Sequence, residues 1–341
     1  MQRGPPAVQP PPSFAHAVAA PHTAAAFVAA HYAVAAPVRC ALLNRGFNDV
    51  YAVTTATGDR AILRISGHRG RGDPDAEAAA AFLAHLKGCG VPVAAARPAR
   101  DGRMVTGFPR PDGIRPAVLF DHAEGRVPDL DSADDAALQG MTLARLHDAA
   151  DRWPQREAGR VRLDLDHLLH RPADRLLSAS ILTDDARAVL RPLVGRLAAA
   201  VAALEPLSRT RCHGDCHGLN ARLQPGGPGG GEQAMLFDFD DSGFGYLAYD
   251  LAVHLWAQVS FGRRRHRVWH GFVDGYRRLR PIGRADLEAV HAFVAIRHIW
   301  LMGEFAARLD ITGREQMAWL SRQGDFLLAW EAATIGPRLP L

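Results

Sequence analysis

The chain has 341 residues, of which 48% are hydrophobic and 22% are charged. This balance is typical of a globular protein with a buried core, in one large or two moderate domains, and excludes a long low-complexity chain. Forty Lys and Arg against thirty-six Asp and Glu give a net charge of +4, which is too even to indicate nucleic-acid binding and equally suits a small anionic ligand.

The N-terminal region is rich in Ala and Pro, and we interpret residues 1–37 as a tail that leads into a short helix at about 24–34. Prolines interrupt its apolar stretches, so no secretory signal is expected. No run of about 18 apolar residues occurs, so no transmembrane helix is expected either. The cysteines are too few and too scattered for a disulfide framework, and a reduced, cytoplasmic setting is the expectation. They are Cys40, Cys89, Cys212 and Cys216.

Residues 38–120 are predicted to form a small lobe rich in β-strands. The β-branched and aromatic stretch 50–55, the turn signal at Gly58 and the apolar stretch 61–65 together predict a hairpin. A helix is predicted at 74–87, where a proline stands at the entry and glycines follow the end. Further short strands are expected at 91–93, 105–108 and 117–120, the last leading into a hinge.

Residues 121–335 are predicted to form a larger, mainly helical lobe. Apolar residues recur at helical spacing in three stretches, which are 136–147, 184–204 and 251–330. Within this half, a Gly/Pro loop separates two short apolar segments, which predicts a second hairpin at 220–223 and 234–237. A cleft between two such lobes is a natural ligand site.

Two short acidic segments carry the side chains that phosphoryl transfer requires. They are HGDCHGLN at 213–220 and FDFDD at 237–241, directly after an apolar strand. Transfer requires one carboxylate to orient the attacking hydroxyl and accept its proton, while an Asn oxygen and a second carboxylate hold magnesium against the phosphates. The spacing from Asp215 to Asn220 lets one loop present the base and a metal ligand together, as in protein kinases.

These segments resemble the motifs of the aminoglycoside phosphotransferase and choline kinase superfamily. Residues 213–220 are similar to its H-G-D-x-H-x-x-N catalytic loop, and 237–241 to its I-D-F-D-D metal-binding segment. The likeness covers most of residues 38–254. Further similar segments are FNDVY at 47–51, ILRI at 62–65, GMTLARLH at 140–147 and YDLA at 249–252.

The resemblance implies an α+β, bilobal protein-kinase-like fold with a nucleotide-binding N-lobe. It implies an enzyme that moves the γ-phosphoryl group of ATP to a hydroxyl group with the help of Mg²⁺. Asp215 would be the catalytic base, and Asn220 and Asp238 would ligate magnesium. The remaining implied roles are nucleotide contacts at Asn48, Arg64 and Phe120, and support of the catalytic loop by His213, His217 and Asp250.

The nucleotide lobe departs from the family at the basic residue of the third strand, where Arg64 replaces a lysine. Arginine stays charged and can grip phosphate oxygens with two donors. The carboxylate that should pair with it is expected near Ala79, whereas the helix offers Glu77. Two residues correspond to about 200° of rotation on a helix, so the sequence leaves open whether Glu77 pairs with Arg64.

The acceptor is expected to be a small molecule: an amino alcohol, an amino sugar or a hydroxy amino acid. A Ser/Thr protein kinase of the bacterial stress-response type and a degenerate nucleotide-binding protein remain alternatives. A third alternative is a metal-binding protein that uses the Cys and His residues of 212–217, although zinc sites usually need a second ligand pair elsewhere.

The basic run at 263–267 lacks interleaved aromatic residues, so we interpret it as a solvated face and expect neither nucleic acid nor membrane as a partner. Apolar residues at 293–303 recur at helical spacing and are predicted to pack in the core. This region and Glu304 would line the acceptor side of the cleft. The oligomeric state is left open.

Overall fold

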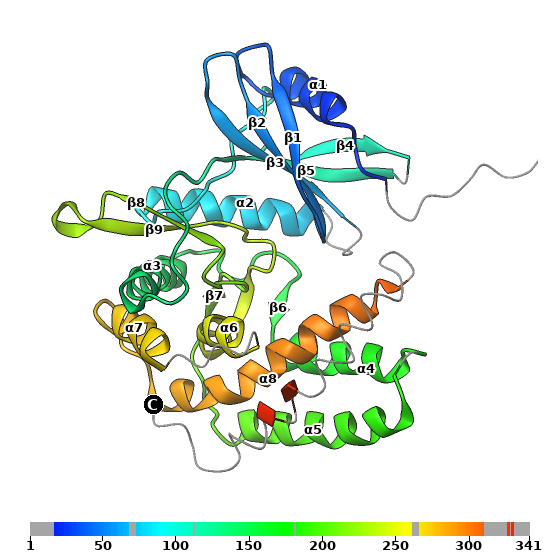
Figure 1. Ribbon diagram of the computed structural model, residues 1–341, viewed down its shortest axis with the longest axis vertical. Helices are drawn as coiled ribbons and strands as arrows, with labels where there is room; N and C mark the ends of the chain where they lie inside the picture. Colours follow the sequence, from blue (N-terminus) through cyan, green and yellow to red (C-terminus); the bar gives the residue numbers. More distant parts are fainter. Residues whose placement is uncertain are drawn as a thin grey trace, which may run out of the picture.

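A five-stranded antiparallel sheet forms one end of the molecule, and helices form most of the other end (Figure 1). The computed structural model describes residues 17–67, 73–111, 113–180, 182–260, 266–309, 326–327 and 329–330. The sheet has the strand order β1-β2-β3-β5-β4. The predicted combination of a small β-rich part and a larger helical part is confirmed. The strands are β1 (Arg39–Arg45), β2 (Asn48–Thr54), β3 (Arg60–Ser66), β4 (Thr106–Arg110) and β5 (Gly113–Asp121).

The predicted hairpin is formed by β2 and β3, which pair along their whole length from Asn48↔Ser66 to Thr54↔Arg60. Side chains alternate between the two faces of a strand. Leu63 and Ile65 therefore enter the core under helix α1, whereas Ile62 and Arg64 line a cavity on the opposite face.

Helix α1 (Pro21–His31) covers the outer face of the sheet, with Phe27 packed on Phe108 at a ring-centroid distance of 4.7 Å. The predicted bounds of 24–34 were wrong by three residues at each end. The helix begins earlier because Pro21 occupies a first-turn position, where its missing N–H costs nothing. It ends earlier because Tyr32 is extended and buried beneath it.

Helix α2 (Asp73–Gly88) lies between the sheet and the helical part, and its Phe82 and Leu86 belong to the main core. The strand predicted at 91–93 is not formed. Val93 makes only an isolated bridge to Leu236, and Pro92 has no N–H with which to extend a ladder.

The helical part confirms the predicted stretches at 136–147 and 184–204. Ser132 and Thr183 cap α3 and α5 by accepting hydrogen bonds from backbone N–H groups three residues ahead, which satisfies donors that the first turn leaves unpaired. The α-helices here are α3 (Ala133–Asp151), α4 (Arg171–Ser178), α5 (Asp184–Ala202), α6 (Leu247–Val259), α7 (His266–Arg277) and α8 (Arg284–Ala306).

Short strands frame two loops of the helical part. The predicted second hairpin is confirmed as β8 (Ala221–Pro225) paired with β9 (Glu232–Leu236). A three-stranded sheet that was not predicted has the order β6-β10-β7. Its strands have two to four residues, too few for an alternation that the sequence could reveal. They are β6 (Arg162–Leu163), β7 (Arg209–Cys212) and β10 (Gly243–Tyr246).

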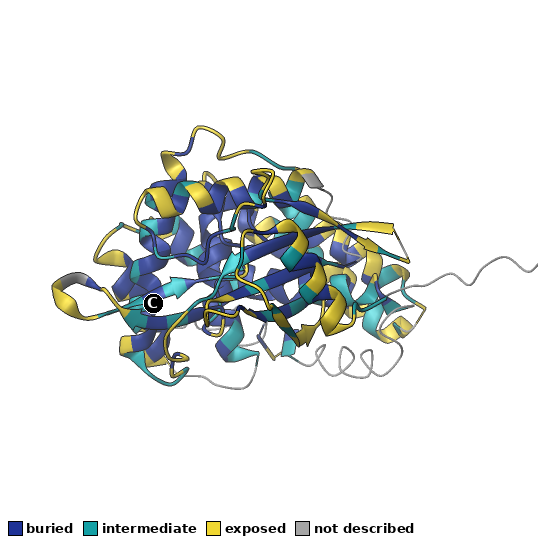
Figure 2. Cartoon of the chain, turned by 90° about the horizontal axis from the view of Figure 1, so that it is seen from above, coloured by how far each residue is buried: buried dark blue, intermediate teal, exposed yellow. Residues whose placement is uncertain are grey.

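Buried residues concentrate in the middle of the molecule, and exposed residues lie on loops and outer helix faces (Figure 2). All four cysteines are free. Among the described helices, none combines the length and apolar character needed to cross a membrane. Residues 263–265 of the basic run lie outside the described residues. Arg267 lies in the first turn of α7 and is exposed.

Helices α3 and α7 pack so closely that glycine is required at their contact. A Cβ atom on Gly275 would overlap the carbonyl oxygen of Ala137, and one on Gly140 would overlap that of Phe272. We expect Gly275→Ala to lower the free energy of unfolding by about 1–3 kcal/mol, because overpacking forces the backbones apart. Urea unfolding measures this change.

Gly195→Ala on α5 is the matched control, since nothing lies within 4 Å of its added methyl group. It should raise stability by up to about 1 kcal/mol through helix propensity. Equal effects of the two substitutions would contradict the close packing of α3 on α7.

Candidate functional site

A cavity of about 590 Å³ lies between the sheet and the helical part. Two loops form its floor: the HGD loop (residues 213–220), which joins β7 to β8, and the acidic loop (residues 237–242), which joins β9 to β10. The structure thus brings most of the predicted site residues into one space. Those that line it are Asn48, Arg64, Phe120, Asp215, His217, Asn220 and Asp238.

Asp250, on α6, lies fully buried beneath the HGD loop and holds its backbone. One carboxylate oxygen accepts a hydrogen bond from the N–H of His213 at 2.7 Å, and the other from the N–H of Gly214 at 2.8 Å. His147 on α3 approaches at 3.0 Å. Burial alone would raise the pKa of Asp250, but the hydrogen bond from His147 and the neighbouring charges outweigh it and lower the pKa. Asp250 therefore stays ionised.

His213 connects the two loops as a neutral imidazole. Its Nδ1 accepts a hydrogen bond from the N–H of Asp215 at 3.2 Å, so Nε2 carries the proton and donates it to the carbonyl of Phe237 at 3.0 Å. Complete burial lowers the pKa of His213 below the ordinary value, which favours this neutral form.

Gly214 explains why the HGD motif needs its glycine. Its φ of 85° lies in the left-handed region, and a Cβ there would overlap the carbonyl oxygen of Asp241 in the acidic loop. The two loops therefore approach each other backbone to backbone, which brings their carboxylates together.

Both oxygens of the Asp215 carboxylate are hydrogen-bonded from different sides. Nδ2 of Asn220 donates to Oδ2 at 3.0 Å, and Nη2 of Arg297 donates to Oδ1 at 2.5 Å. His217 Nε2 lies 3.7 Å from Oδ2. The side chain is fixed in one orientation toward the cavity, and the amide oxygen of Asn220 is left as the atom that could ligate a cation.

Arg297 on α8 was not predicted from the sequence, where it is one arginine among helical apolar residues. It is 3% exposed and lies near the rings of Trp256 and Trp300, at 5.1 and 4.4 Å from the ring centroids. Nη1 donates to the hydroxyl of Tyr249 at 3.0 Å and lies 3.8 Å from Oδ2 of Asp241. The one available signal was a charged residue inside the apolar stretch 293–303. A buried arginine is normally paired, so its presence in a core helix indicates a buried acidic partner.

Asp238 adopts a backbone φ of 66°, the one positive value among described residues other than glycine. Such a conformation often marks a functional position. Its side chain is open to the cavity, yet the surrounding protein excludes much bulk water. This desolvation, with the charge of Asp215 second, raises the pKa of Asp238. A carboxylate in such surroundings favours a bound cation, and Asp238 with Asn220 could hold one.

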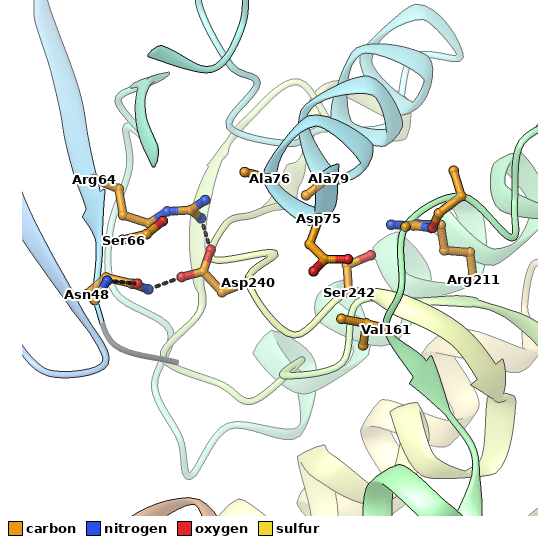
Figure 3. A pocket seen from close by; sticks show the side chains of 13 residues that line it. Asn48, Arg64, Ser66, Asp75, Ala76, Ala79, Val161, Arg211, Asp240 and Ser242 are labelled. Atoms are coloured by element: carbon orange, nitrogen blue, oxygen red, sulfur yellow. Dashed lines mark hydrogen bonds and ion pairs between the residues drawn. The ribbon is translucent and has the colours of Figure 1, made fainter. Parts of the chain in front are cut away.

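Two side chains from the five-stranded sheet converge on Asp240 of the acidic loop (Figure 3). The Arg64 guanidinium forms an ion pair with Asp240, and Asn48 donates a hydrogen bond to the second oxygen of that carboxylate. Arg64 also lies 4.9 Å from the centre of the Phe120 ring. Glu77 is exposed, and the carboxylate that forms an ion pair with Arg64 here is that of Asp240.

The Cys and His residues of 212–217 do not come together as a group of potential metal ligands among the described residues. Cys212 and Cys216 are buried, and burial raises the pKa of both thiols well above the ordinary value. Within the described ranges, one group of potential ligands lies close together: His147, Cys212 and Asp250. His147 already contacts Asp250 and the hydroxyl of Tyr276, so the group is a hydrogen-bonded cluster.

The prediction that Glu304 lines the acceptor side was wrong. Glu304 forms an ion pair with Arg175 on α4 at 2.7 Å and is not among the residues that line the large cavity. Phe293, Ile296 and Ile299 pack in the core as predicted, whereas Trp300 both packs there and lines the cavity.

A second cavity of about 520 Å³ adjoins the first beyond the HGD loop, and His217 and Trp256 line both. Its other walls are mostly apolar. They include Leu130, Ala136, Leu219, Ala257 and Val268.

A five-stranded sheet, a helical part and two acidic loops facing the cavity between them define a kinase-like phosphotransferase. Residues 40–282 match the phosphotransferase enzyme family. This range is more than half of the chain, so the chain belongs to that family. The family resemblance and the bilobal kinase-like fold predicted from the sequence are confirmed.

Two relatives illustrate the likeness. An uncharacterized protein of Deinococcus radiodurans is 38% identical over 93% of this chain and 91% of its own length. A homoserine kinase of Cupriavidus taiwanensis is 28% identical over 76% of this chain and 71% of its own length.

Two solved structures share the fold. A microcompartment-associated aminopropanol kinase superposes with a TM-score of 0.73 and 24% identity, covering 94% of this chain and all of that chain. The amicoumacin kinase hAmiN, in complex with AMP-PNP, Ca²⁺ and Ami, superposes with a TM-score of 0.72 and 20% identity, covering 93% and 95%.

The raised pKa of Asp238 predicts a conflict between stability and cation binding. Because folding favours its protonated form, stability is lost as the pH rises through the folded pKa. Asp238→Asn should therefore raise the unfolding temperature without metal at pH 7, and the gain should shrink on acidification. Thermal unfolding at pH 7 and pH 4 tests this.

The same experiment with added Mg²⁺ or Mn²⁺ should stabilise the unsubstituted protein and not Asp238→Asn. The control is Asp274→Asn, at an exposed position on α7. It should change neither the unfolding temperature without metal nor the stabilisation by added metal. A metal-dependent stabilisation that survives Asp238→Asn would exclude Asp238 as a ligand.

Proposed function

We propose that this protein transfers the γ-phosphoryl group of ATP, with Mg²⁺, to a hydroxyl group of a small molecule. The observation that supports this most is the convergence of Asp215, Asn220 and Asp238 on one cavity that also contains Arg64. The homoserine kinase relative and the aminopropanol kinase neighbour act, by their names, on small hydroxyl compounds.

The nucleotide would occupy the part of the cavity beneath the sheet. Val50, Ile62 and Phe120 offer apolar contacts for the base, next to the chain segment 121–123. Arg64 would contact the phosphates, because a guanidinium can donate to two phosphate oxygens at once. Asn220 and Asp238 would hold a divalent cation against the β- and γ-phosphates.

The chemical step would be an in-line displacement. The Asp215 carboxylate accepts the proton of the acceptor hydroxyl while the hydroxyl oxygen forms a bond to the γ-phosphorus. The bond from that phosphorus to the β–γ bridging oxygen breaks, and ADP leaves with the electron pair. Arg297 and Asn220 hold Asp215 in position, which matters because phosphoryl transfer depends mainly on positioning and charge stabilisation.

The acceptor would lie beside Trp256 and Trp300. The carboxylates on this side, Asp215 and Asp241, both face Arg297. A polycationic amino sugar would have to compete with this arginine, whereas a compact alcohol with an apolar segment could use the indole rings and the adjoining cavity. An amino alcohol or a hydroxy amino acid therefore fits better than a polyamine sugar.

A protein kinase remains the second candidate because the same motifs would serve a Ser or Thr hydroxyl. Incubation with ATP and a panel of amino alcohols, hydroxy amino acids, amino sugars and protein substrates distinguishes the two. Phosphate transfer to proteins alone would overturn the small-molecule assignment. The absence of transfer to every acceptor, together with intact nucleotide binding, would favour the degenerate nucleotide-binding alternative.

Asp215→Asn should lower kcat by about 10²–10⁴-fold, since the amide cannot accept the hydroxyl proton. The dissociation constant for ATP should change little, because Asp215 would contact the acceptor. Steady-state kinetics and calorimetric titration with ATP measure the two quantities. Full activity in this variant would remove Asp215 as the base.

Arg297→Met should lower kcat by about 10²-fold, because a carboxylate that has lost its fixed donor no longer aligns the hydroxyl. Arg297→Lys should retain more activity, and the KM for ATP should stay nearly constant in both. The control is Arg284→Met on α8, whose ion pair with Glu288 is on the surface and contributes little. A wild-type kcat in Arg297→Met would show that Asp215 needs no such support.

A further inference from the structure

The side chain of Arg64 on β3 is held by the acidic loop. The Arg64 side chain is only 10% exposed and its partner carboxylate on Asp240 is 12% exposed. Asn48 on β2 donates to the other carboxylate oxygen and accepts a hydrogen bond from the N–H of Gly67 at 3.2 Å. Two adjacent strands thus converge on one carboxylate two residues beyond Asp238.

Two alanines of helix α2 lie on the face that the helix turns toward Arg64. Ala76 and Ala79 stand there and line a small cavity of about 30 Å³ together with Arg64 (Figure 3). Asp75 lines the same cavity but accepts a hydrogen bond from the N–H of Arg160 at 2.7 Å. Glu77 is exposed on another side of the helix.

The other arginine of this small cavity has a different environment. Arg211 lies about 5 Å from the rings of Phe82 and Trp153 and donates to the carbonyl of Ala158 at 2.6 Å. It lies across the cavity from Asp240 (Figure 3). Of the two arginines that line the small cavity, Arg64 is therefore the one that also lines the large cavity, together with Asp238.

A long arginine side chain has about 2 kcal/mol of rotamer entropy to lose when it is fixed. A partner that holds the guanidinium beforehand lowers this cost for a ligand that binds afterwards. Asp240 can do so without using all of the N–H donors of Arg64, because a guanidinium has five.

We infer that Asp240 is a positioning residue: it holds the Arg64 guanidinium where nucleotide phosphates can reach it, in a chain that has Ala79 on the facing helix. This inference rests on the proposed function, since it assumes that Arg64 contacts phosphates. The orientation of Arg64 then depends on the acidic loop, which also carries Asp238. Phosphate contact and cation binding are thereby linked through one short segment.

A double-substitution cycle tests the inference. Arg64→Met and Asp240→Asn should each weaken binding of Mg·ATP by about tenfold, and the double variant should bind no more weakly than Arg64→Met alone, because contacting residues are not additive. Calorimetric titration gives the dissociation constants. Effects that multiply, or undiminished binding in Asp240→Asn, would overturn the inference.

A second set of titrations separates positioning from metal ligation. With ADP in the presence of EDTA, the coupling between Arg64 and Asp240 should persist, because no metal takes part. Coupling that vanishes in EDTA would make Asp240 a metal ligand and would overturn the positioning role. If the unsubstituted protein bound no nucleotide at all, the proposed function would fail as well; normal binding with no coupling would remove only this inference.

Rescue from the helix gives an independent measurement. Ala79→Glu in the Asp240→Asn background places a carboxylate in the small cavity with Arg64. The double variant should bind Mg·ATP at least threefold more tightly than Asp240→Asn alone. The matched control is Ala81→Glu, an exposed position of the same helix, which should restore nothing. Equal affinities for Mg·ATP in the folded Ala79→Glu and Ala81→Glu variants would count against positioning. If Ala79→Glu does not fold, the double-substitution cycle of Arg64 and Asp240 decides the question.

Discussion

The buried carboxylate of Asp250 is the interaction on which the site depends. It accepts hydrogen bonds from two successive backbone N–H groups of the HGD loop, and His147 contacts it from a third direction. A fully buried charge is costly unless it is satisfied in this way. The arrangement fixes the backbone just before Asp215, so the position of the Asp215 carboxylate depends on the contact between His147 on α3 and Asp250 on α6.

The site balances carboxylates from two loops with arginines from two distant elements. Asp215 and Asp241 face Arg297 on α8, and Asp240 faces Arg64 on β3. Asp238 remains open to the cavity, and its pKa is raised first by desolvation and then by the like charge of Asp215. The pattern leaves one carboxylate for a cation while neighbouring ones are held in orientation, which is the preorganisation that phosphoryl transfer requires.

Helix α8 connects the two sides of the cavity. Arg297 reaches the HGD loop. Near the end of the helix, the ring centroid of Phe305 lies 5.5 Å from that of Phe47, in the turn between β1 and β2. Arg308, just beyond the helix, donates to the carbonyl of Gly46 at 3.2 Å. Helix α8 and the residue just beyond it therefore contact both the HGD loop and the turn between β1 and β2.

The sequence by itself determined the two acidic loops, the α+β division, the hairpin that carries Arg64 and most of the long helices. These features follow from local spacing: alternation along a strand, apolar recurrence along a helix, and side chains a few positions apart on one loop. The tertiary structure alone decided which charges meet. Arg297 and Asp215 are 82 residues apart in the chain, and Arg64 on β3 pairs with Asp240 of the acidic loop. Such pairings depend on how distant elements pack, and no local pattern records that.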